Sequence, residues 1–408
     1  MHTFTKASDV LPHLMGLYGR KNVQELDRYK SVLSQFNKLF CHKWAYLCSA
    51  SGRVEFVGNH TDHNGGRVVA CAVNLDIVAA CQPNGTDVIR IEGKNRHPIT
   101  FSIYDLSKVS GSASLARGVV AYLKGQGYTV GGFDAYTDST IPTGAGVSSS
   151  AAFETVIATV ISHLFNNGQI PTEQIAKAGQ FAENEYFDKP CGLLDQSVVA
   201  VGGMVALDFA NGLHYHSVIS SNGGAFDKLQ FVLINTGASH SNLSSLYAQI
   251  PADMRKVANF FHKQRLIDVD EMEFYSKYDE CIAAVGIGAA LRAKHFFEEN
   301  HRVDSLQQAL AQGDVGQVID IVNSSGDSSS NQLRNCAVDD NDTAIQDIIR
   351  TVRAICPCGA RVHGGGFAGT VLCVVPREYA SQFVAQVTSI YGNNVLPLRV
   401  REKGAVML

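Results

Sequence analysis

The segment that most constrains this chain is residues 141–152, which read IPTGAGVSSSAA. Small residues at positions 144–146 let the backbone turn tightly and approach an anion closely. An apolar stretch without Gly or Pro follows at residues 151–165, as a buried helix requires. Residues 148–150 therefore stand at the first turn of that helix, where unpaired N–H groups and the helix dipole attract anions. The pattern predicts a phosphate-binding loop at a helix N-terminus.

Two common nucleotide-binding motifs do not describe this loop. No Gly-Lys-Ser/Thr triplet follows the glycines, so the lysine of a Walker A motif is missing. The GxGxxG pattern of dinucleotide-binding folds, with its acidic residue about 20 positions later, is missing as well. A Gly/Ser turn without a ligand is the alternative. The joint occurrence of Pro, glycines, serines and a long apolar helix favours phosphate binding.

The loop resembles the second motif of the GHMP kinases, which wraps the nucleotide triphosphate in that family. A second segment, residues 51–66, reads SGRVEFVGNHTDHNGG and resembles the galactokinase signature. It places Asn59, His60 and Asp62 after a strand-like run, where short polar side chains can bind sugar hydroxyls. A polar turn that only reverses the chain is the alternative. Together with the loop downstream, this segment predicts a sugar site.

Three further segments extend the resemblance toward the C-terminus. Residues 189–196 resemble the family segment that carries the catalytic aspartate, here Asp195. Residues 363–369 resemble the third GHMP motif, a glycine-rich loop against the nucleotide-binding region. Residues 240–247 resemble a galactokinase segment whose tyrosine, here Tyr247, lines the sugar pocket. The motifs occur in the order of the family and at roughly its spacings.

The resemblance implies an ATP-dependent sugar kinase that phosphorylates the anomeric hydroxyl of galactose to give galactose 1-phosphate. Such phosphoryl transfer depends mainly on positioning and charge neutralisation. Asp195 is expected to orient or deprotonate the attacking hydroxyl, and Arg53 to keep Asp195 ionised and stabilise the transferred group. A purely structural ion pair between them is the alternative. Mg²⁺, a hard cation, is expected at Ser150 and Glu183.

The other expected site residues come from the same motifs. ATP is expected at Gly144, Ala145, Gly146, Val147, Ser148, Ser149, Ser150 and Ala151. The sugar is expected at Asn59, His60, Asp62, Gly192 and Tyr247. ATP and Mg²⁺ are the implied cofactors, and small molecules rather than nucleic acid or membrane are the implied partners. A monomer or weak homo-oligomer is expected.

Four positions of the signature depart from the family. Ser51 replaces the usual Pro, and His63 replaces the usual Tyr. Glu55 and Asn59 replace the usual Asn and Glu, so these two side chains have in effect exchanged places. On a continuous strand they would lie roughly 13 Å apart, so Glu55 would not substitute for the missing carboxylate.

In galactokinases that carboxylate contacts the 6-hydroxyl of the sugar, and an amide accepts such a bond more weakly. The sequence therefore predicts weak affinity for galactose, or preference for a sugar altered at C5 or C6. It also predicts that Asn59→Glu tightens galactose binding. A kinase for an N-acetylhexosamine, a 6-deoxy sugar or a pentose is the nearest alternative. A catalytically inactive, ATP- and sugar-binding regulator is another, but intact residues 148–152, Arg53 and Asp195 favour an enzyme.

Composition limits the setting of the protein. The 408 residues carry a net charge of −4, which offers no basic surface to nucleic acid. The longest apolar runs are too short to cross a bilayer, and the first residues lack a signal-peptide core. Ten cysteines are too few for a disulfide scaffold in a chain of this length. We expect a cytoplasmic protein with reduced thiols.

Strand-like and helix-like segments follow one another without strict alternation, which indicates an α+β protein. The resemblance implies a two-lobed GHMP kinase fold with the active site between the lobes. We expect the first lobe at 1–215, with a helical extension at 1–40, and the second at 216–408. A helix is expected through 172–187, and a polar loop at 324–330.

Overall fold

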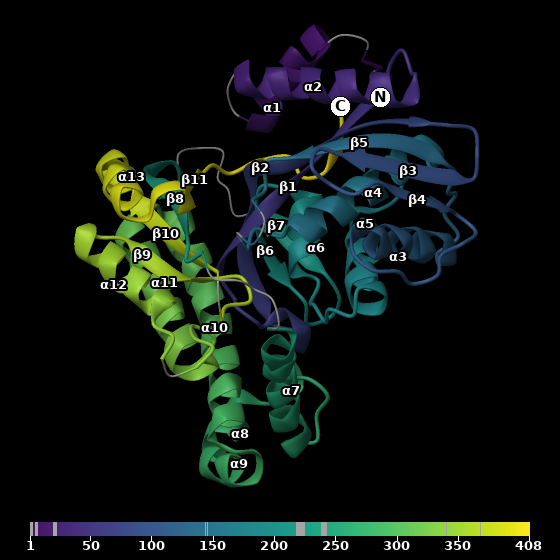
Figure 1. The fold of residues 1–408 in the computed structure, drawn as a ribbon. Coiled ribbons are helices and arrows are strands. Elements are labelled where there is room, and N and C mark those ends of the chain that lie inside the picture. Colours follow the sequence, from purple (N-terminus) through teal and green to yellow (C-terminus); the bar gives the residue numbers. More distant parts are fainter. Residues whose placement is uncertain are drawn as a thin grey trace.

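The computed structural model describes residues 3–4, 7–18, 23–142, 144, 146–217, 225–237, 243–339, 341–367 and 369–408. Helices and strands form two lobes that lie side by side (Figure 1). The expected α+β, two-lobed architecture is therefore confirmed. None of the described helices combines the length and the apolar character needed to cross a membrane.

The first lobe is built on a mixed sheet whose main path runs β12-β1-β2-β5-β3-β4, with β6 pairing with both β2 and β7. Among the strands that the structure describes, only β3 and β5 pair in parallel. Its strands are β1 (Tyr46–Val57), β2 (Arg67–Pro83), β3 (Val88–Gly93), β4 (Ile99–Ser102), β5 (Phe133–Ser139), β6 (Met204–Asp208), β7 (His214–Ser217) and β12 (Val406–Met407). The long central strands β1 and β2 carry the segment that resembles the galactokinase signature.

Both faces of this sheet are covered by helices. Side chains alternate along each strand, so the strands present apolar residues to both layers of helices. Leu47, Val78 and Ala80 pack against the N-terminal helices, whereas Cys48 and Ala79 face the opposite layer. The N-terminal helices are α1 (Leu11–Tyr18) and α2 (Val23–Phe40). The opposite layer comprises α3 (Ser112–Gly125), α4 (Ser149–Phe165), α5 (Thr172–Phe181) and α6 (Leu194–Val201). Figure 1 shows α1 and α2 on one side of the sheet and α4 to α6 on the other.

The second lobe holds a smaller antiparallel sheet in the order β11-β8-β10-β9. Its elements are β8 (Leu229–Asn235), α7 (Ser244–Phe260), α8 (Glu271–Ser276), α9 (Tyr278–Val285), α10 (Ile287–Gln312), α11 (Val315–Ser328), α12 (Ala344–Ile355), β9 (Gly359–His363), β10 (Thr370–Pro376), α13 (Arg377–Tyr391) and β11 (Val395–Leu398). Helices α12 and α13 pack on one face, and α10 and α11 on the other.

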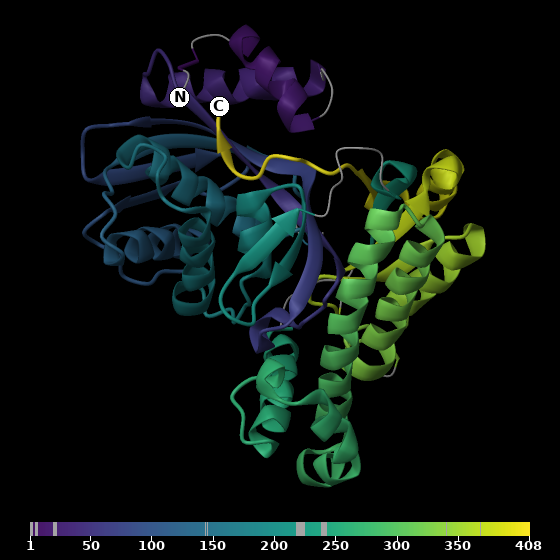
Figure 2. The same ribbon diagram turned by 180° about the vertical axis from the view of Figure 1, so that it is seen from behind.

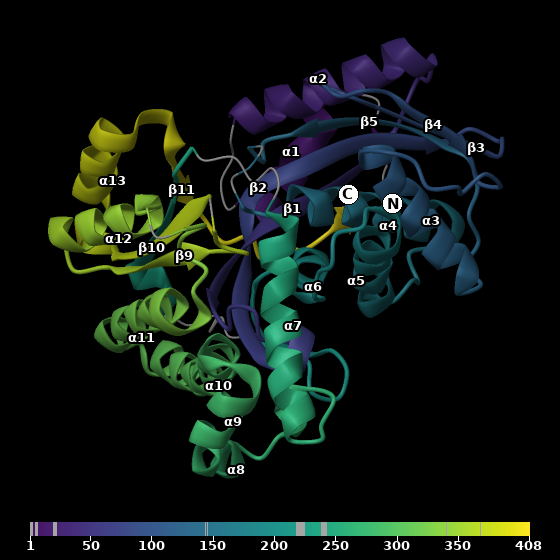
Figure 3. The same ribbon diagram turned by 60° about the horizontal axis from the view of Figure 1, so that its bottom comes forward.

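The two lobes share one apolar core. The ring of Phe56 on β1 meets that of Phe231 on β8 with 4.9 Å between centroids. Figure 2 shows the long helix α10 running beside β1 and β2, which it contacts. Helix α7 stands between the lobes in Figure 3 and packs on the short turn at Asp62–Asn64. The sugar signature therefore lies at the junction of the lobes.

The expected polar loop at 324–330 is wrong, because α11 continues through it and runs into a π-helical turn at Ser329–Leu333. Ser325 is buried and donates its hydroxyl to Glu299 on α10. Ser328 donates to Gln332 at 2.6 Å. A Cβ at Gly326 would lie 2.7 Å from the carbonyl oxygen of Ala360, so this glycine permits close packing on β9. The small polar residues serve helix packing rather than solvent exposure.

The chain after β11 returns to the first lobe, where β12 pairs with β1. Arg401 in this returning segment is fully buried and donates to Asp76 on β2 at 2.9 Å. Asp76 also accepts from Arg28 of α2, Tyr18 of α1 and Ser49 of β1, each at 2.6 Å. Burial opposes ionisation of Asp76, but the two arginines outweigh it and lower its pKa. One carboxylate thus joins the N-terminal helices, the sheet and the returning chain.

We predict that Asp76→Asn lowers the free energy of unfolding by about 3–5 kcal/mol, because it leaves two buried guanidinium groups without their counter-charge. Urea unfolding followed by circular dichroism measures this change. Asp27→Asn is the matched control, since Asp27 forms an exposed pair with Lys30 and should change stability by less than about 1 kcal/mol. Equal effects of the two substitutions would contradict the prediction.

Candidate active site

Arg53 is placed by irregularities in β1. The pairing of β1 with β2 shifts register between Ser51 and Arg53, and again between Glu55 and Val57. Such bulges turn a side chain away from the regular alternation of a strand. A Cβ at Gly52 would lie 2.6 Å from the carbonyl oxygen of Val147, and that oxygen accepts the Arg53 amide at 3.2 Å. The glycine therefore brings β1 into contact with the predicted phosphate loop.

The predicted pair of Arg53 and Asp195 is present. The guanidinium donates through Nε to Asp195 Oδ1 at 2.7 Å, and its Nη2 lies 2.6 Å from the same oxygen. Its Nη1 donates to the carbonyl oxygen of Gly146 at 2.6 Å. Burial raises the pKa of Asp195, but Arg53 and a hydrogen bond from Ser148 lower it by more, so the net shift is downward. Asp195 is therefore an ionised carboxylate in contact with the loop.

The phosphate loop leads into α4 as expected. Ser148 precedes the helix in a left-handed conformation with φ of 60°, and it directs its hydroxyl to Asp195. The first-turn N–H groups of Ser149, Ser150 and Ala151 have no acceptor four residues earlier within the helix. Gly144 and Gly146 both have positive φ. Ala145 lies outside the described residues.

Ser150 and Glu183, the predicted metal ligands, are in contact: the Ser150 hydroxyl donates to Glu183 Oε1. The expected helix through 172–187 does not continue regularly, since a π-helical turn at Ala182–Tyr186 carries Glu183. Lys189 Nζ also reaches Glu183 Oε1 at 2.9 Å. A hydroxyl beside a buried carboxylate fits Mg²⁺, which usually takes one or two protein oxygens and completes its shell with water and phosphate oxygens.

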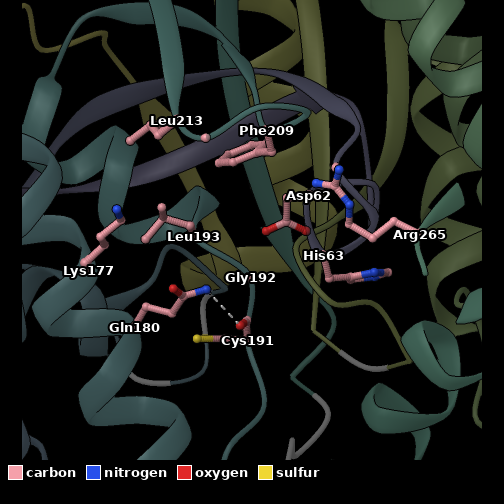
Figure 4. Close-up of a pocket in the computed structure, with 12 residues that line it drawn as sticks. Asp62, His63, Lys177, Gln180, Cys191, Gly192, Leu193, Phe209, Leu213 and Arg265 are labelled. Atoms are coloured by element: carbon pink, nitrogen blue, oxygen red, sulfur yellow. Dashed lines mark hydrogen bonds between the residues drawn. The ribbon is translucent and has the colours of Figure 1, made fainter. Parts of the chain in front are cut away.

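A cleft of about 360 Å³ opens next to Asp62 and Gly192. Figure 4 shows the Asp62 carboxylate near its centre, between Phe209 and the side chains of His63 and Arg265. A Cβ at Gly192 would lie 1.7 Å from Asp62 Oδ2, so a larger residue there would displace the Asp62 carboxylate. The cleft is lined by Asp62, His63, Gly65, Lys177, Gln180, Cys191, Gly192, Leu193, Phe209, Gly212, Leu213 and Arg265.

The electrostatic state of Asp62 differs from that of Asp195. Burial, followed by the nearby charge of Asp195, raises the pKa of Asp62 to about 6. The backbone amide of Leu194 partly opposes this shift by donating to Asp62 at 3.3 Å. Two of the five predicted sugar residues, Asp62 and Gly192, thus line the cleft together.

The expected separation of Glu55 and Asn59 is wrong. Gly58, with φ of 101°, ends the strand and turns the chain back. Asn59 Nδ2 therefore donates to Glu55 Oε1 at 2.9 Å. Glu55 also lies 3.2 Å from Arg361, and burial raises its pKa to about 7. The exchanged amide and carboxylate form one buried contact.

Asn59, His60 and Tyr247 are the other three predicted sugar residues, and their polar atoms meet the glycine-rich loop of the second lobe. Asn59 Nδ2 donates to the carbonyl oxygen of Gly364 at 2.9 Å, and its Oδ1 accepts from Asn335 at 2.9 Å. His60 and Tyr247 likewise contact carbonyl oxygens of this loop. These three side chains are not among the residues that line the cleft.

Four residues that the sequence motifs did not assign occupy the junction. Arg361 is fully buried and donates to the carbonyl oxygen of Phe56 at 2.8 Å. Glu299 accepts the Gly58 amide at 2.9 Å. His363 Nε2 lies 3.4 Å from Arg53 Nη1. His363 opens a quoted motif. Glu299 lies on α10, Arg361 on β9 and Asn335 just after the π-helical turn at Ser329–Leu333, and none of the three belongs to a motif, so only the fold places them here.

Comparison with known proteins agrees with this geometry. Residues 34–83 match the galactokinase galactose-binding signature, and residues 114–203 match the GHMP kinases N terminal domain. The first range contains Arg53, Asn59 and Asp62; the second contains the phosphate loop and Asp195.

The fold is also shared with solved structures. Galactokinase from Lactococcus lactis, complexed with galactose, superposes with a TM-score of 0.81 at 24% identity, over 92% of this chain and 98% of that one. Mevalonate kinase from Methanococcus jannaschii gives 0.61 at 15% identity, over 87% and 98%. D-glycero-D-manno-heptose 1-phosphate kinase from Bacteroides thetaiotaomicron gives 0.60 at 15%, over 89% and 98%. The chain therefore carries the galactose-binding signature of galactokinases and a GHMP kinase N-terminal domain, and these matches indicate a sugar kinase.

Proposed function

We propose that this protein transfers the γ-phosphoryl group of ATP to the anomeric hydroxyl of a free sugar, with galactose as the first candidate. The observation that carries the proposal is the Arg53–Asp195 pair, which joins the phosphate loop to the cleft beside Asp62. The galactose-binding signature at 34–83 supports a hexose acceptor. Ten free thiols support a reducing, cytoplasmic setting.

Each step of the transfer has a candidate residue. The ionised Asp195 would accept a hydrogen bond from the attacking hydroxyl and orient it, and would take its proton late in the transfer. Arg53, fixed by Asp195 and Gly146, would face the charge that develops on the transferred group. Ser150 and Glu183 would hold Mg²⁺, which neutralises phosphate charge when bound. Asp62 would bind ring hydroxyls from the cleft side.

A sugar altered at C5 or C6 is a second candidate acceptor. In galactokinases the residue at position 59 is a glutamate that contacts the 6-hydroxyl, whereas both N–H groups of Asn59 here donate to protein acceptors. Asn59 would therefore have no donor left for a sugar hydroxyl. A 6-deoxy sugar or a pentose needs no such contact at C6 and is therefore the second candidate after galactose.

A panel of monosaccharides tests the proposal. Purified protein is incubated with ATP, Mg²⁺ and each sugar, ADP release is recorded, and the product is located by NMR. We expect a sugar 1-phosphate from galactose, a 6-deoxy sugar or a pentose. Phosphate on another hydroxyl, or no ADP with any sugar, would disprove the proposal.

We predict that Asp195→Ala lowers kcat by about a hundredfold or more, the scale of a general base or key orienting group. ATP affinity should change much less than kcat, because Asp195 would act on the sugar hydroxyl and touches the phosphate loop through the Ser148 hydroxyl alone among its described contacts. Steady-state kinetics and titration with a fluorescent ATP analogue measure the two quantities. Asp105→Ala, in an exposed loop, is the control. Near-normal kcat in the Asp195 variant would show that the catalytic centre lies elsewhere.

The contact between Asn59 and Glu55 reverses the effect expected for Asn59→Glu. A glutamate at this position meets the Glu55 carboxylate and the Gly364 carbonyl oxygen, both of which are acceptors. We predict that the single substitution raises the KM for galactose about tenfold or more, since a buried polar contact is lost. Adding Glu55→Asn restores an amide–carboxylate pair and should recover part of that loss.

Kinetics with galactose and urea unfolding of wild type, both single variants and the double variant complete this test. A double-mutant cycle isolates the pairwise term. If Asn59→Glu alone tightens galactose binding, the pairing with Glu55 does not control residue 59.

A further inference from the structure

The π-helical turn after α5 carries Glu183, and the loop that follows it folds back on this residue. Asp188 has φ of 53°, in the left-handed region, and so reverses the direction of the chain. The Lys189 amide then donates to the Glu183 carbonyl oxygen at 3.0 Å. Pro190 restricts the backbone of Lys189 to extended conformations. The backbone therefore limits the directions that the Lys189 side chain can take.

Lys189 directs its ammonium group to Glu183, which the proposed function places at Mg²⁺. Its Nζ lies 2.9 Å from Glu183 Oε1 and 3.2 Å from Oε2, so it contacts both carboxylate oxygens. The Ser150 hydroxyl, in the first turn of α4, donates to the same Oε1. One carboxylate oxygen thus connects the Lys189 ammonium with the start of the helix that is predicted to bind phosphate.

The two members of this ion pair differ in burial. The Glu183 side chain is 2% exposed, whereas that of Lys189 is 46% exposed. The buried carboxylate is held by its surroundings, while the lysine ends in a flexible chain of four carbons that reaches solvent. Lys189 can therefore change partners without a rearrangement of the helices around it.

The charge of Lys189 also reaches Asp195. Burial raises the pKa of Asp195, whereas Arg53 and, to a lesser extent, Lys189 lower it. The ammonium group thus lies near both the proposed metal ligand and the proposed catalytic aspartate. The proposed function places the terminal phosphates of ATP between these two groups.

ATP-dependent phosphotransferases of other folds use a lysine in addition to Mg²⁺ at the phosphates of the nucleotide. Residues 141–152, which form the phosphate loop and the start of α4, contain no lysine. Lys189 offers an ammonium group to the same region from a different part of the chain.

We propose that Lys189 is a phosphate-binding residue that pairs with Glu183 in the ligand-free protein and turns to the β- and γ-phosphates when ATP and Mg²⁺ bind. This inference rests on the proposed function, because it takes the phosphate loop as the ATP site. In the exchange, Glu183 keeps a cationic partner and the ammonium group keeps an anionic one. No charge is left uncompensated in either state.

Lys189→Met tests the proposal, since it removes the charge and keeps the length of the side chain. The dissociation constant for ATP, measured by calorimetry with excess Mg²⁺ and without sugar, should rise about tenfold, as for a lost hydrogen bond to a charged group. The dissociation constant for AMP, which has no β- or γ-phosphate, should change less than twofold. Lys189→Arg keeps the charge and should recover part of the ATP affinity.

A metal titration distinguishes this role from that of a merely structural ion pair. Mn²⁺, which takes the same oxygen ligands as Mg²⁺, is titrated into the nucleotide-free protein and followed by electron paramagnetic resonance. Lys189→Met removes a cation that competes for Glu183, so Mn²⁺ should bind about threefold more tightly than to wild type. Loss of a pair that only holds Glu183 in place would instead weaken binding of the metal.

Lys277→Met is the matched control. Lys277 pairs with Glu273 at 2.7 Å, and its side chain is 46% exposed, like that of Lys189. It follows α8, which lies at the lower end of the second lobe in Figure 1. This variant should change neither ATP nor Mn²⁺ affinity. Urea unfolding checks that each variant is folded, and Lys189→Gln, which keeps a donor for Glu183, replaces the methionine variant if that one does not fold.

Unchanged ATP affinity in the uncharged variant, or an equal loss of affinity for ATP and AMP, would overturn the inference. Mn²⁺ binding that is unchanged or weaker would overturn it as well. Wild-type protein that binds ATP but phosphorylates no sugar would contradict the proposed function alone. The two failures are therefore distinguishable.

Discussion

The site depends on a single guanidinium group. Arg53 leaves β1 between two breaks in its register and contacts the phosphate loop, the aspartate at the start of α6 and the histidine before the glycine-rich loop. These partners come from three separate parts of the chain. In a regular strand, the side chain at position 53 would follow the strict alternation between the two faces of the sheet. The bulge and Gly52 turn it toward these three partners instead.

Buried charge joins the two lobes around this centre. Arg361 on β9 lies between Glu55 of the first lobe and Glu299 on α10, and all three side chains are almost fully buried. Burial would raise the pKa of Glu299, but His295, Arg361 and Arg302 lower it to about 2. Removing one member of such a group leaves an uncompensated charge, which makes the arrangement specific to one relative placement of the lobes.

Much of the candidate site could be predicted from the sequence. The phosphate loop, the sugar signature and the Asp195 segment are short local motifs, and their residue types indicate the chemistry that they can perform. The pairs Arg53–Asp195 and Ser150–Glu183 are present as the motifs implied. The contact of Asn59 with Glu55 was missed, because it depends on the turn at Gly58 and not on strand spacing. Residues 324–330 were predicted to form a loop because they are small and polar. In the folded lobe, hydroxyls of this segment instead donate to Glu299 and Gln332.

The return of the chain to the first sheet affects how the protein can be made and divided. Asp76 needs Arg401, which lies 325 positions later, to complete its set of partners. During synthesis the first lobe must therefore wait, with a buried carboxylate only partly neutralised, until the whole second lobe has emerged from the ribosome. A fragment that stops at the lobe boundary would lack both this arginine and the edge strand β12. The smaller lobe is thus an insertion within the larger one, and the two are separate in shape but interdependent in folding.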